Sequence, residues 1–360
     1  MSSIPHVLDD ITPGWLTAAL RNNGHPRQER VESISAERIG QGRGFAGSIA
    51  RLTVRYTGDS DTPSSLIAKL PSIDPHIRRY AIEDGMYRRE TMFYRELATR
   101  SAVAVPGCYF ADLDADTGDF ILLLEDLGGL RGGSEIAGCS LDEAELVVRN
   151  LARLHARWWN EELITGLDWL AGEDDSSATF GALQGLYRDA WSRSGDTLAA
   201  IFPPDTFAIA ERFGQGLAAV LEASTSGPQT LNHGDCHLGN LFFGDDQVVF
   251  TDWQNVMLTS PALDIAYFIQ GSLSSETRRT HERELLNTYR STLAENGVTS
   301  YPSEKLIEDY RRGLLVSLIP SVLSVANLDM VTPESLEMTK TIGARMIAIA
   351  DWDCGDLIPA

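Results

Sequence analysis

The chain has 360 residues, of which 43% are hydrophobic and 22% charged, so a folded core is available and disordered or fibrous classes are excluded. Its 51 acidic residues outnumber the 30 basic ones and give a formal net charge of −21. Nucleic acids and anionic membrane surfaces attract proteins through Lys and Arg, so this balance predicts no nucleic-acid partner and no membrane partner.

The first third of the chain is predicted to be rich in strands. Thr12 and Pro13 mark the start of a short first helix, because Thr caps a helix and Pro suits its first turn. A glycine-rich segment at 40–47 separates the first two strand-like runs. The strand-like runs span residues 31–39, 48–56, 65–70, 107–113 and 120–124. Between the third and fourth runs, Asp74-Pro75 begins a long helical stretch that reaches about residue 100.

The pattern becomes mostly helical after residue 129. Ser140 and Glu143 form a capping box at the start of a helix with one apolar stripe. Further helices are predicted at 179–193 and 205–223, and from starts near residues 260, 275, 302 and 332. Short strands flank 232–240 and cover 248–252. We therefore expect an α+β, bilobed protein: a β-rich N-lobe over 1–124 with one long helix, a hinge at 125–129, and a mainly helical C-lobe over 130–360.

The cysteines and the N-terminus bear on the compartment. Four cysteines lie far apart with no paired spacing, which indicates reduced thiols. The first ten residues lack the basic and apolar blocks of a signal peptide, so we expect a cytoplasmic protein. The apolar stretch 313–328 is short and contains Pro320, which favours a buried, kinked helix over a membrane span.

The most informative motif is His233-Gly-Asp235, followed by Asn240 and, on a β-run, by Asp252. Phosphoryl transfer from ATP needs such a set. One carboxylate orients or deprotonates the attacking hydroxyl, and an amide oxygen and a second carboxylate hold Mg²⁺ against the phosphates. An Asx-rich turn before a hairpin is the structural alternative. We expect Asp235 in the first role, and Asn240 and Asp252 in the others.

Lys69 is one of only three lysines, the other 27 basic residues being arginine. It lies in the run Leu66–Leu70, which is otherwise apolar and is expected to be buried, and a buried ammonium needs an anion. Glu90 shares the apolar stripe of the following helix and so points toward the core. A Lys69–Glu90 pair that also holds the α- and β-phosphates would satisfy both groups. A lysine that reaches solvent at a sheet edge, together with a glutamate at a helix boundary, remains the alternative.

Gly42, Gly44 and Gly47 form a Gly-x-Gly-x-x-Gly pattern between two strand-like runs. Backbone N–H groups of such a loop can cover phosphates. The pattern does not lead into a helix, which argues against a dinucleotide fold. By itself it also fits an ordinary flexible hairpin.

With these motifs the chain resembles the aminoglycoside phosphotransferase and choline kinase superfamily, which has a protein-kinase-like fold. It is most similar to the ecdysteroid-kinase-like branch of small-molecule kinases. The segments that carry the resemblance are Gly44–Gly47, Lys69, Arg89–Tyr94, Leu122–Leu127, Leu151–Ala156, His233–Asn240, Asp252–Gln254 and Asp264–Phe268.

The resemblance implies roles for individual positions. Asp235 would be the catalytic base, Asn240 and Asp252 would hold Mg²⁺, and Lys69, kept in place by Glu90, would hold the phosphates of ATP. The backbone from Glu125 to Leu127 would hydrogen-bond adenine. The cofactors implied are ATP and Mg²⁺, and the substrate is a small-molecule alcohol.

Asp264 would brace the catalytic loop. An acidic residue in the first turn of a helix, where the helix dipole stabilises its charge, fits equally well. His155 lies on a helix stripe and is expected to be a core or lobe-contact histidine. His233 and His237 could suggest zinc, but no second ligand cluster accompanies them.

Three other functions remain open. An aminoglycoside-type resistance kinase would suit the negative charge but needs several converging carboxylates, and Glu173–Asp175 is the only obvious loop cluster. A non-catalytic nucleotide-binding module is disfavoured by the complete set of polar residues. A protein kinase is disfavoured by the short segment between Asp252 and Asp264. The acceptor and the oligomeric state are not predictable from this sequence.

Overall fold

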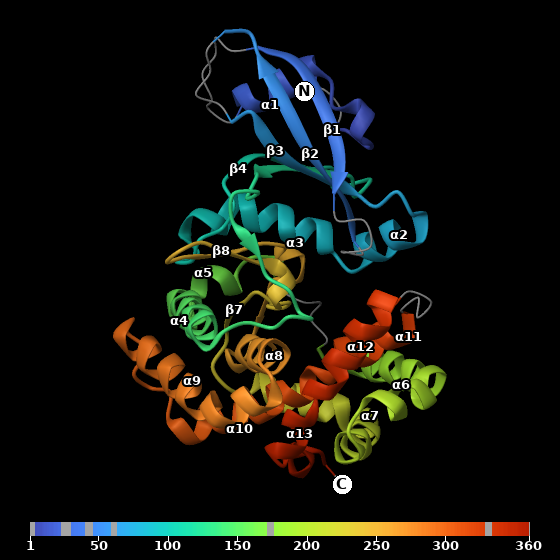
Figure 1. The fold of residues 1–360 in the computed structure, drawn as a ribbon, viewed down its shortest axis with the longest axis vertical. Helices are drawn as coiled ribbons and strands as arrows, with labels where there is room; N and C mark the ends of the chain where they lie inside the picture. Colours follow the sequence, from blue (N-terminus) through green and yellow to red (C-terminus); the bar gives the residue numbers. More distant parts are fainter. Residues whose placement is uncertain are drawn as a thin grey trace. The chain divides into compact units, whose positions relative to one another are not determined.

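The computed structural model describes residues 4–22, 30–39, 46–58, 63–170, 176–327 and 333–359. They form two compact units (Figure 1), which are described separately. Unit 1 comprises Met1–Arg131 and Val249–Asn255, and unit 2 comprises Gly132–Val248 and Val256–Ala360. The predicted hinge at 125–129 lies just before the first crossing between units. Residues 249–255, expected in the second part, group with the first.

Unit 1 is built on a five-stranded antiparallel sheet with the strand order β1-β2-β3-β5-β4. Its strands are β1 (Val31–Ile39), β2 (Gly47–Tyr56), β3 (Ser65–Pro71), β4 (Cys108–Leu113) and β5 (Phe120–Glu125). Its helices are α1 (Pro13–Asn22), α2 (Pro75–Glu83) and α3 (Met86–Met92). Short helical turns are η1 (Leu8–Asp10), η2 (Phe93–Leu97, a π-turn), η3 (Ala98–Arg100) and η5 (Trp253–Asn255).

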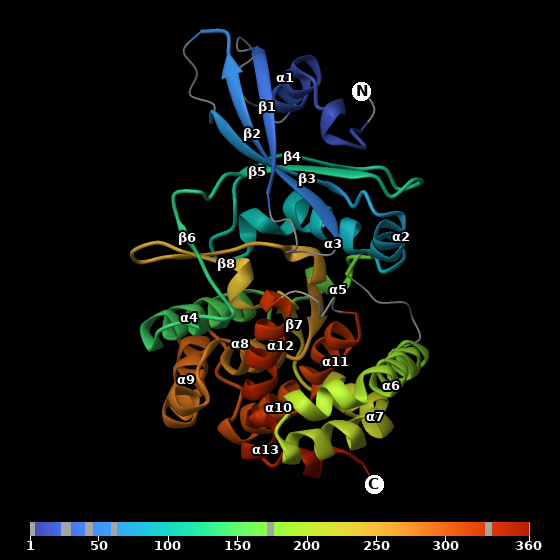
Figure 2. The same cartoon turned by 45° about the vertical axis from the view of Figure 1, so that its right-hand side comes forward.

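Helix α1 covers one face of this sheet (Figures 1 and 2). Leu16 and Leu20 of α1 pack with Leu66, Ala68 and Leu70 of β3 in one buried cluster. Because side chains alternate along a strand, the residue between Ala68 and Leu70 points to the opposite face. That residue is Lys69, and the alternation therefore sets its direction toward α3.

The stretch predicted as one long helix is divided at Gly85. Asp74 caps α2 as expected, accepting hydrogen bonds from the N–H groups of His76 and Ile77 at 2.8 and 3.1 Å. Gly85 has a φ of +78°, a left-handed conformation that separates α2 from α3. A β-carbon would disfavour this conformation, which is why glycine suits the position. From Met86 the chain continues through α3 and η2 to Leu97, so the helix that carries Glu90 is shorter than predicted.

Unit 2 is mainly helical. Its longer helices are α4 (Leu141–Arg157), α6 (Ser176–Ile201), α7 (Pro204–Thr225), α8 (Ala262–Ser272), α9 (Ser275–Glu295), α10 (Ser303–Val316), α11 (Leu318–Asn327) and α12 (Pro333–Arg345). Shorter helices are α5 (Glu162–Thr165), α13 (Ile347–Asp351), η4 (Leu238–Asn240) and η6 (Cys354–Leu357). Short strands are β6 (Arg131–Gly132), β7 (Thr230–Asn232), β8 (Leu241–Phe243), β9 (Val248–Phe250) and β10 (Met257–Thr259), with β6 and β9 at the division between units.

Local signals fix several of these helices. The predicted capping box is confirmed at α4, where Ser140 Oγ accepts from Glu143 N at 3.2 Å and Glu143 Oε2 accepts from Ser140 N at 2.9 Å. The apolar stretch predicted as a kinked helix is divided between α10 and α11 at Ser317. Helix α4 packs on α9, α8 on α10, and α6 on α7 and α11. The two strands β7 and β10 pair antiparallel and carry the segment that begins at His233.

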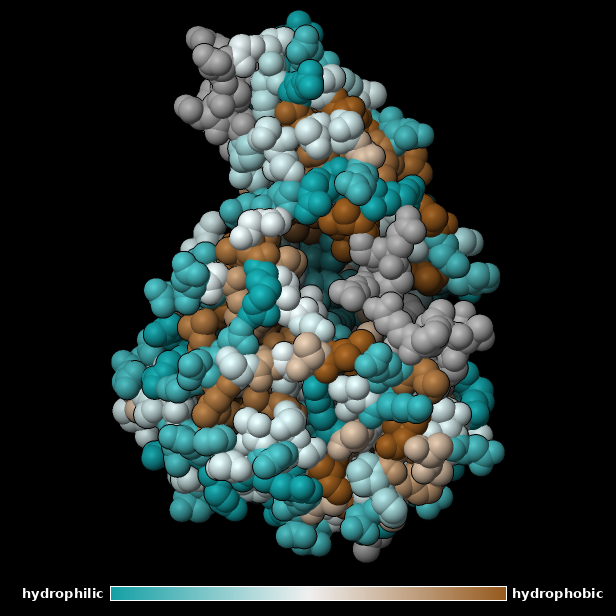
Figure 3. All heavy atoms as spheres, in the orientation of Figure 1, coloured by the Kyte–Doolittle hydropathy of each residue, from teal (hydrophilic) through white to brown (hydrophobic). Residues whose placement is uncertain are grey.

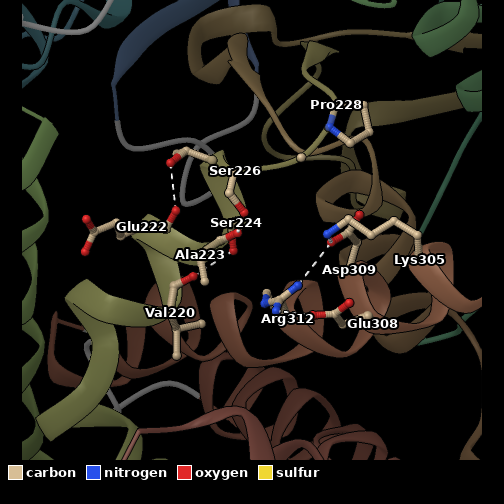
Figure 4. Close-up of polar contacts among 12 residues, drawn as sticks. Val220, Glu222, Ala223, Ser224, Ser226, Pro228, Lys305, Glu308, Asp309 and Arg312 are labelled. Carbon is tan, nitrogen blue, oxygen red and sulfur yellow. Dashed lines mark hydrogen bonds and ion pairs between the residues drawn. The ribbon is translucent and has the colours of Figure 1, made fainter.

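Lys305 belongs to an ion-pair cluster within α10. Lys305 of α10 pairs with the buried Asp309 at 2.8 Å, and Arg312 pairs with the same carboxylate at 3.3 Å (Figure 4). A β-carbon on Gly227, just beyond the C-terminus of α7, would meet Lys305 Nζ at 3.5 Å. The ammonium thus lies close to the C-terminal end of α7, where a positive charge is favourable.

The surface of unit 2 is mixed in polarity. On the face in Figure 3, apolar side chains are interspersed with hydrophilic ones. Large apolar side chains that are exposed, such as Leu163, Leu186 and Leu336, belong to three different helices. Within the described ranges, no helix has an apolar run long enough to cross a membrane.

Candidate functional site

Lys69 is held between two carboxylates inside unit 1. Its Nζ lies 2.7 Å from Glu90 Oε2 and 2.8 Å from Asp252 Oδ1. The side chains of Lys69 and Glu90 are only 7% and 2% exposed, and that of Asp252 is 21% exposed. The Lys69–Glu90 pair anticipated from the sequence is therefore present, and Asp252 is a second partner.

The pair is also unusual in its protonation. Burial opposes the charge of the Lys69 ammonium, but attraction by Asp252 and Glu90 outweighs burial and raises its pKa. Burial raises the pKa of Glu90 to about 7, against the attraction of Lys69, and repulsion from Asp252 acts in the same direction as burial. Such perturbed groups are typical of functional sites.

Asp252 adopts a conformation that few residues other than glycine tolerate. Its φ is +64°, in the left-handed region, where Asp is one of the better-tolerated side chains. The next residue, Trp253, is fully buried and stacks on Phe93, with ring centroids 3.9 Å apart and planes 9° apart. Trp253 Nε1 donates to Phe250 O at 3.1 Å, and Arg89 Nε donates to Gln254 O at 2.9 Å. These contacts overcome the strain at Asp252 and hold its carboxylate beside Lys69.

Of the predicted glycine loop, Gly42 and Gly44 lie outside the described residues. Gly47 is the first residue of β2 and pairs with Pro71 of β3. A β-carbon on Gly47 would lie 3.0 Å from Leu70 O and 3.6 Å from two carbons of Lys69. Glycine at 47 thus allows β2 to approach the Lys69 side chain closely.

The predicted adenine-binding segment begins at the end of β5. Glu125 N donates to Gly107 O at 2.8 Å, and Glu125 Oε2 accepts from Gly107 N at 3.0 Å. Leu127 is buried, and its carbonyl oxygen accepts from Leu130 N at 2.8 Å. The Glu125 N–H is therefore already used within unit 1, so a base would have to use other backbone groups. The adenine role of Glu125–Leu127 stays a prediction.

Asp126, between them, is tied to the neighbouring strands. Its Oδ2 accepts from Arg51 Nε at 2.7 Å and from Ser65 Oγ at 2.5 Å. Its Oδ1 accepts from Arg51 Nη2 at 3.1 Å and from Gly128 N at 3.0 Å. The hydrogen bonds from Arg51 lower the pKa of Asp126 to about 2, against the effect of burial. The hydrogen bonds from Ser65 and Gly128 N and the charge of Arg51 act in the same direction as the Arg51 hydrogen bonds.

This shift predicts an acid dependence of stability. The Asp126 pKa is about 2 in the folded protein against an ordinary 3.8, so its contribution is complete above pH 4 and is lost as the pH falls toward 2. We expect on the order of 1–2 kcal/mol, because Arg51 is partly exposed and its charge is screened. Urea unfolding of the wild type and of Asp126→Asn checks this. The difference in unfolding free energy should shrink between pH 5 and pH 2.5, and a constant difference would contradict it.

In unit 2, Asp264 holds the backbone that precedes Asp235. Its Oδ2 accepts from His233 N at 2.6 Å and its Oδ1 accepts from Gly234 N at 2.9 Å. Burial acts to raise the pKa of Asp264, but His155, His233 and the Gly234 N–H outweigh it and lower that pKa. The predicted bracing of the loop by Asp264 is confirmed. Asp264 is therefore more than a first-turn acid stabilised by the helix dipole.

His155 extends the brace into the core. It is fully buried on α4, with Nε2 3.3 Å from Asp264 Oδ2 and Nδ1 2.7 Å from the Tyr289 hydroxyl. Tyr289, on α9, is also fully buried. The expected core histidine thus has a specific partner on each ring nitrogen, and α4, α8 and α9 together position the His233–Gly234 peptides.

The loop from Asp235 to Asn240 is closed by its own backbone. Asp235 O accepts from His237 N at 2.9 Å and from Asn240 Nδ2 at 3.0 Å, and His237 O accepts from Asn240 N at 3.0 Å. Because the Asn240 Nδ2 group donates to Asp235 O, the amide oxygen lies on the opposite side of that group. Asn240 Oδ1 is the amide atom that would contact a cation, and the metal role of Asn240 stays a prediction.

Two side chains lie beside the Asp235 carboxylate, and a third, Glu135, lies behind one of them. The Tyr267 hydroxyl, from α8, hydrogen-bonds it, and burial together with the charges of Asp235 and Glu135 raises the pKa of Tyr267. His237 Nε2 lies 3.7 Å from Asp235 Oδ2, and its Nδ1 lies 3.5 Å from Glu135 Oε2. His237 Nδ1 also accepts from Gly239 N at 3.1 Å, and Nε2 is the ring nitrogen that faces Asp235.

The sequence did not reveal all of these residues. Tyr267 follows Asp264 by three positions on α8, and such residues share a helix face. That spacing could have identified Tyr267 as a second side chain aimed at the loop. Arg51 and Glu135 gave no local signal, because their partners are far away in the chain. Among the described residues, no group of three His, Cys, Asp or Glu side chains could hold a metal alone.

Comparisons with known proteins agree with this architecture. A family model for the ecdysteroid kinase-like family matches residues 41–157 and 176–298, two thirds of the chain. A choline kinase from Cryptosporidium parvum Iowa II has a similar structure, with a TM-score of 0.58 and 11% identity over 94% of each chain. No curated protein sequence matches the chain.

Two further solved structures share the fold. An ethanolamine kinase from Plasmodium vivax has a TM-score of 0.53 and 14% identity, over 89% of this chain and 82% of that one. An amicoumacin kinase in complex with AMP-PNP and Ca²⁺ has a TM-score of 0.53 and 12% identity, over 93% and 92%.

The α+β, protein-kinase-like fold class predicted from the sequence is confirmed by these similarities and by the antiparallel sheet of unit 1 and the helices of unit 2. The structural identities are low and concern the fold alone. The family model extends over the segments that contain Lys69, Glu90, Asp235, Asn240 and Asp252. The chain belongs to the ecdysteroid kinase-like family.

Proposed function

We propose that the protein is an ATP- and Mg²⁺-dependent O-phosphotransferase that phosphorylates a hydroxyl group of a small molecule. The observation that carries this proposal is the buried Lys69, held by Glu90 and Asp252 at 2.7 and 2.8 Å. A nearly buried ammonium between two carboxylates, one of them partly exposed on a strained backbone, is suited to a charged ligand at that carboxylate.

The nucleotide would be held mainly by unit 1. Lys69 would contact the α- and β-phosphates, with Glu90 keeping its ammonium in place. Gly42, Gly44 and Gly47 would offer backbone N–H groups to the phosphates. The strand register supports a role for Glu125–Leu127 in binding the base: Lys69 pairs with Leu122, and three residues of strand cover roughly 10 Å. A comparable distance separates base and phosphates in an extended nucleotide.

Asp252 and Asn240 have the oxygen donors that suit Mg²⁺. This ion is usually bound by one or two protein oxygens together with substrate phosphates and water, so a complete protein cage is not required. Asp252 is 21% exposed, and the amide of Asn240 is oriented by its bond to Asp235 O. When bound, the ion would neutralise charge on the phosphates.

Asp235 would act on the acceptor. Its carboxylate would take the proton of the acceptor hydroxyl, whose oxygen attacks the γ-phosphorus while the bond to ADP breaks. Asp264 holds the two peptides before Asp235, which would fix the carboxylate in the site. The products are a phosphate monoester, ADP and a proton.

An ATP-consumption screen tests the proposal. Purified protein with Mg²⁺ and ATP is incubated with sterols, polyketides, aminoglycosides, choline and nucleosides, and ADP formation is compared with that in acceptor-free reactions. At least one class of alcohol should raise ADP formation and yield a phosphorylated product by mass spectrometry. Failure of every class, together with no ATP binding in calorimetry, would reject the proposal.

Chelation is expected to abolish turnover with any acceptor found in this screen. Asn240 and Asp252 can supply only part of a coordination shell, so the metal should exchange with EDTA, and added Mg²⁺ should restore activity. The measurement is the rate of ADP formation before chelation, in EDTA and after Mg²⁺ addition. Full activity in chelator would contradict a role of Asn240 and Asp252 as metal ligands.

A further inference from the structure

The carboxylate of Asp126 is saturated with hydrogen bonds inside unit 1. Oδ2 accepts from Arg51 Nε and Ser65 Oγ, and Oδ1 accepts from Arg51 Nη2 and Gly128 N, at distances between 2.5 and 3.1 Å. A carboxylate offers about four acceptor positions, and all four are occupied. Asp126 therefore has no free acceptor with which to bind a base or a ribose.

These bonds fix a backbone segment. Arg51 belongs to β2 and Ser65 begins β3, so Asp126 ties the chain after β5 to two other strands of the sheet. Gly128 lies directly over the ion pair: a β-carbon there would be 3.2 Å from both Arg51 Nη2 and Asp126 Oδ1. On the other side, Glu125 is bonded twice to Gly107. Residues 125–128 are thus held from both sides by unit 1.

The Asp126–Arg51 ion pair lies directly after the end of β5. Glu125 is exposed at the end of a strand whose preceding four residues are all fully or almost fully buried. The chain therefore leaves the buried part of the sheet at Glu125, where the segment predicted to bind adenine begins. The bidentate contact between Arg51 and Asp126 fixes the orientation of both side chains, which a simple charge attraction does not.

We infer that Asp126 is a positioning residue for the nucleotide base: clamped by Arg51, Ser65 and Gly128 N, it presets the backbone of residues 125–128 that meets adenine. This inference rests on the proposed nucleotide-binding function. The role of Asp126 is indirect. Residues 125–128 are ordered before the nucleotide binds, so the entropic cost of ordering them does not reduce the affinity for the nucleotide.

The experiment separates the base from the phosphates. Calorimetry measures the affinity of the wild type and of Asp126→Asn for Mg²⁺·ATP and for Mg²⁺·tripolyphosphate, which lacks the base and ribose. In the variant an amide N–H group would face the donors of Arg51 or Ser65, so the clamp opens. ATP affinity should fall by roughly 10-fold, because binding must then also order residues 125–128, and tripolyphosphate affinity should stay within about twofold.

Two further variants guard against misfolding and general effects. Arg51→Lys keeps the charge but loses the two-pronged contact, and it should show the same selective loss to a smaller degree. Asp112→Asn is the matched control, because Asp112, on β4 of the same sheet, pairs with Arg95 of η2 at 2.5 Å. Both affinities of this control should equal those of the wild type.

Each result bears on the inference. An equal fall of both affinities in Asp126→Asn and Arg51→Lys would show that Asp126 only maintains the fold, and unchanged ATP affinity would show that it positions nothing. Either outcome would overturn the inference and leave the proposed phosphotransfer intact. A wild type that binds neither probe would overturn the proposed function as well.

Discussion

Replacement of Asp235 by asparagine is expected to lower the turnover number by about 10²–10⁴-fold, the usual contribution of a general base. The substitution keeps the size of the side chain and its capacity to accept a hydrogen bond from Tyr267, but it removes the charge and the proton acceptor. The affinity for Mg²⁺·ATP should hardly change, because Lys69, Asn240 and Asp252 remain. A coupled assay with an acceptor found in the screen gives the rate, and calorimetry gives the affinity.

A matched control is available on the same part of the chain. Asp245 lies exposed in the turn between β8 and β9, and Asp245→Asn should leave both rate and affinity unchanged. If ATP binding collapsed in Asp235→Asn, Asp235 would be a metal ligand or a structural residue instead of the base. If neither quantity moved, the motif would not be the active site, and a nucleotide-binding module would become the better interpretation.

Replacement of Lys69 by alanine should lower the free energy of unfolding by roughly 3–5 kcal/mol and abolish tight nucleotide binding. Removing one partner leaves Glu90, whose side chain is only 2% exposed, without its counter-charge and next to the second carboxylate of Asp252. The phosphates would also lose their cationic contact. Urea unfolding measures the first effect, and calorimetry with Mg²⁺·ATP at a temperature where the variant is folded measures the second.

The two effects can be separated. Lys69→Met combined with Glu90→Gln removes both buried charges, so stability should largely return while nucleotide affinity stays low. Lys305→Ala is the matched control, because Lys305 also pairs with a buried aspartate, but Asp309 keeps Arg312 and the Tyr301 hydroxyl as partners. Wild-type nucleotide affinity in the Lys69→Met, Glu90→Gln variant would contradict the phosphate role of Lys69.

Local physical signals predicted most of the secondary structure. The run that contains Lys69 was expected to be a largely buried strand, and the structure has β3 there, with Lys69 on the face opposite Ala68 and Leu70. The capping box at Ser140 marked the start of α4, because both of its partners lie within one turn. The division of the long helix at Gly85 was not predicted, since a glycine within an apolar helical pattern is also compatible with an uninterrupted helix.

The chemical character of the site was also legible in the sequence, because it depends on residue type and spacing. Lys69 and Glu90 were expected to pair, and Asp235, Asn240 and Asp252 were singled out as a phosphotransfer set. Their catalytic and metal roles stay predictions. The Lys69–Glu90 contact could be predicted without the tertiary structure, since a lone buried lysine and a glutamate on an apolar stripe each need a partner.

Only the tertiary structure decided which distant segments complete these groups. Asp252 is 183 residues from Lys69, and its position depends on a left-handed backbone held by the stack of Trp253 on Phe93. The Asp126–Arg51 clamp joins residues 75 positions apart. Periodicity and spacing report on neighbours within a turn or a strand, whereas ion pairs and ring stacks between segments depend on how the chain packs. For that reason the sequence determined which residues could perform the chemistry, and the packing determined what holds them in place.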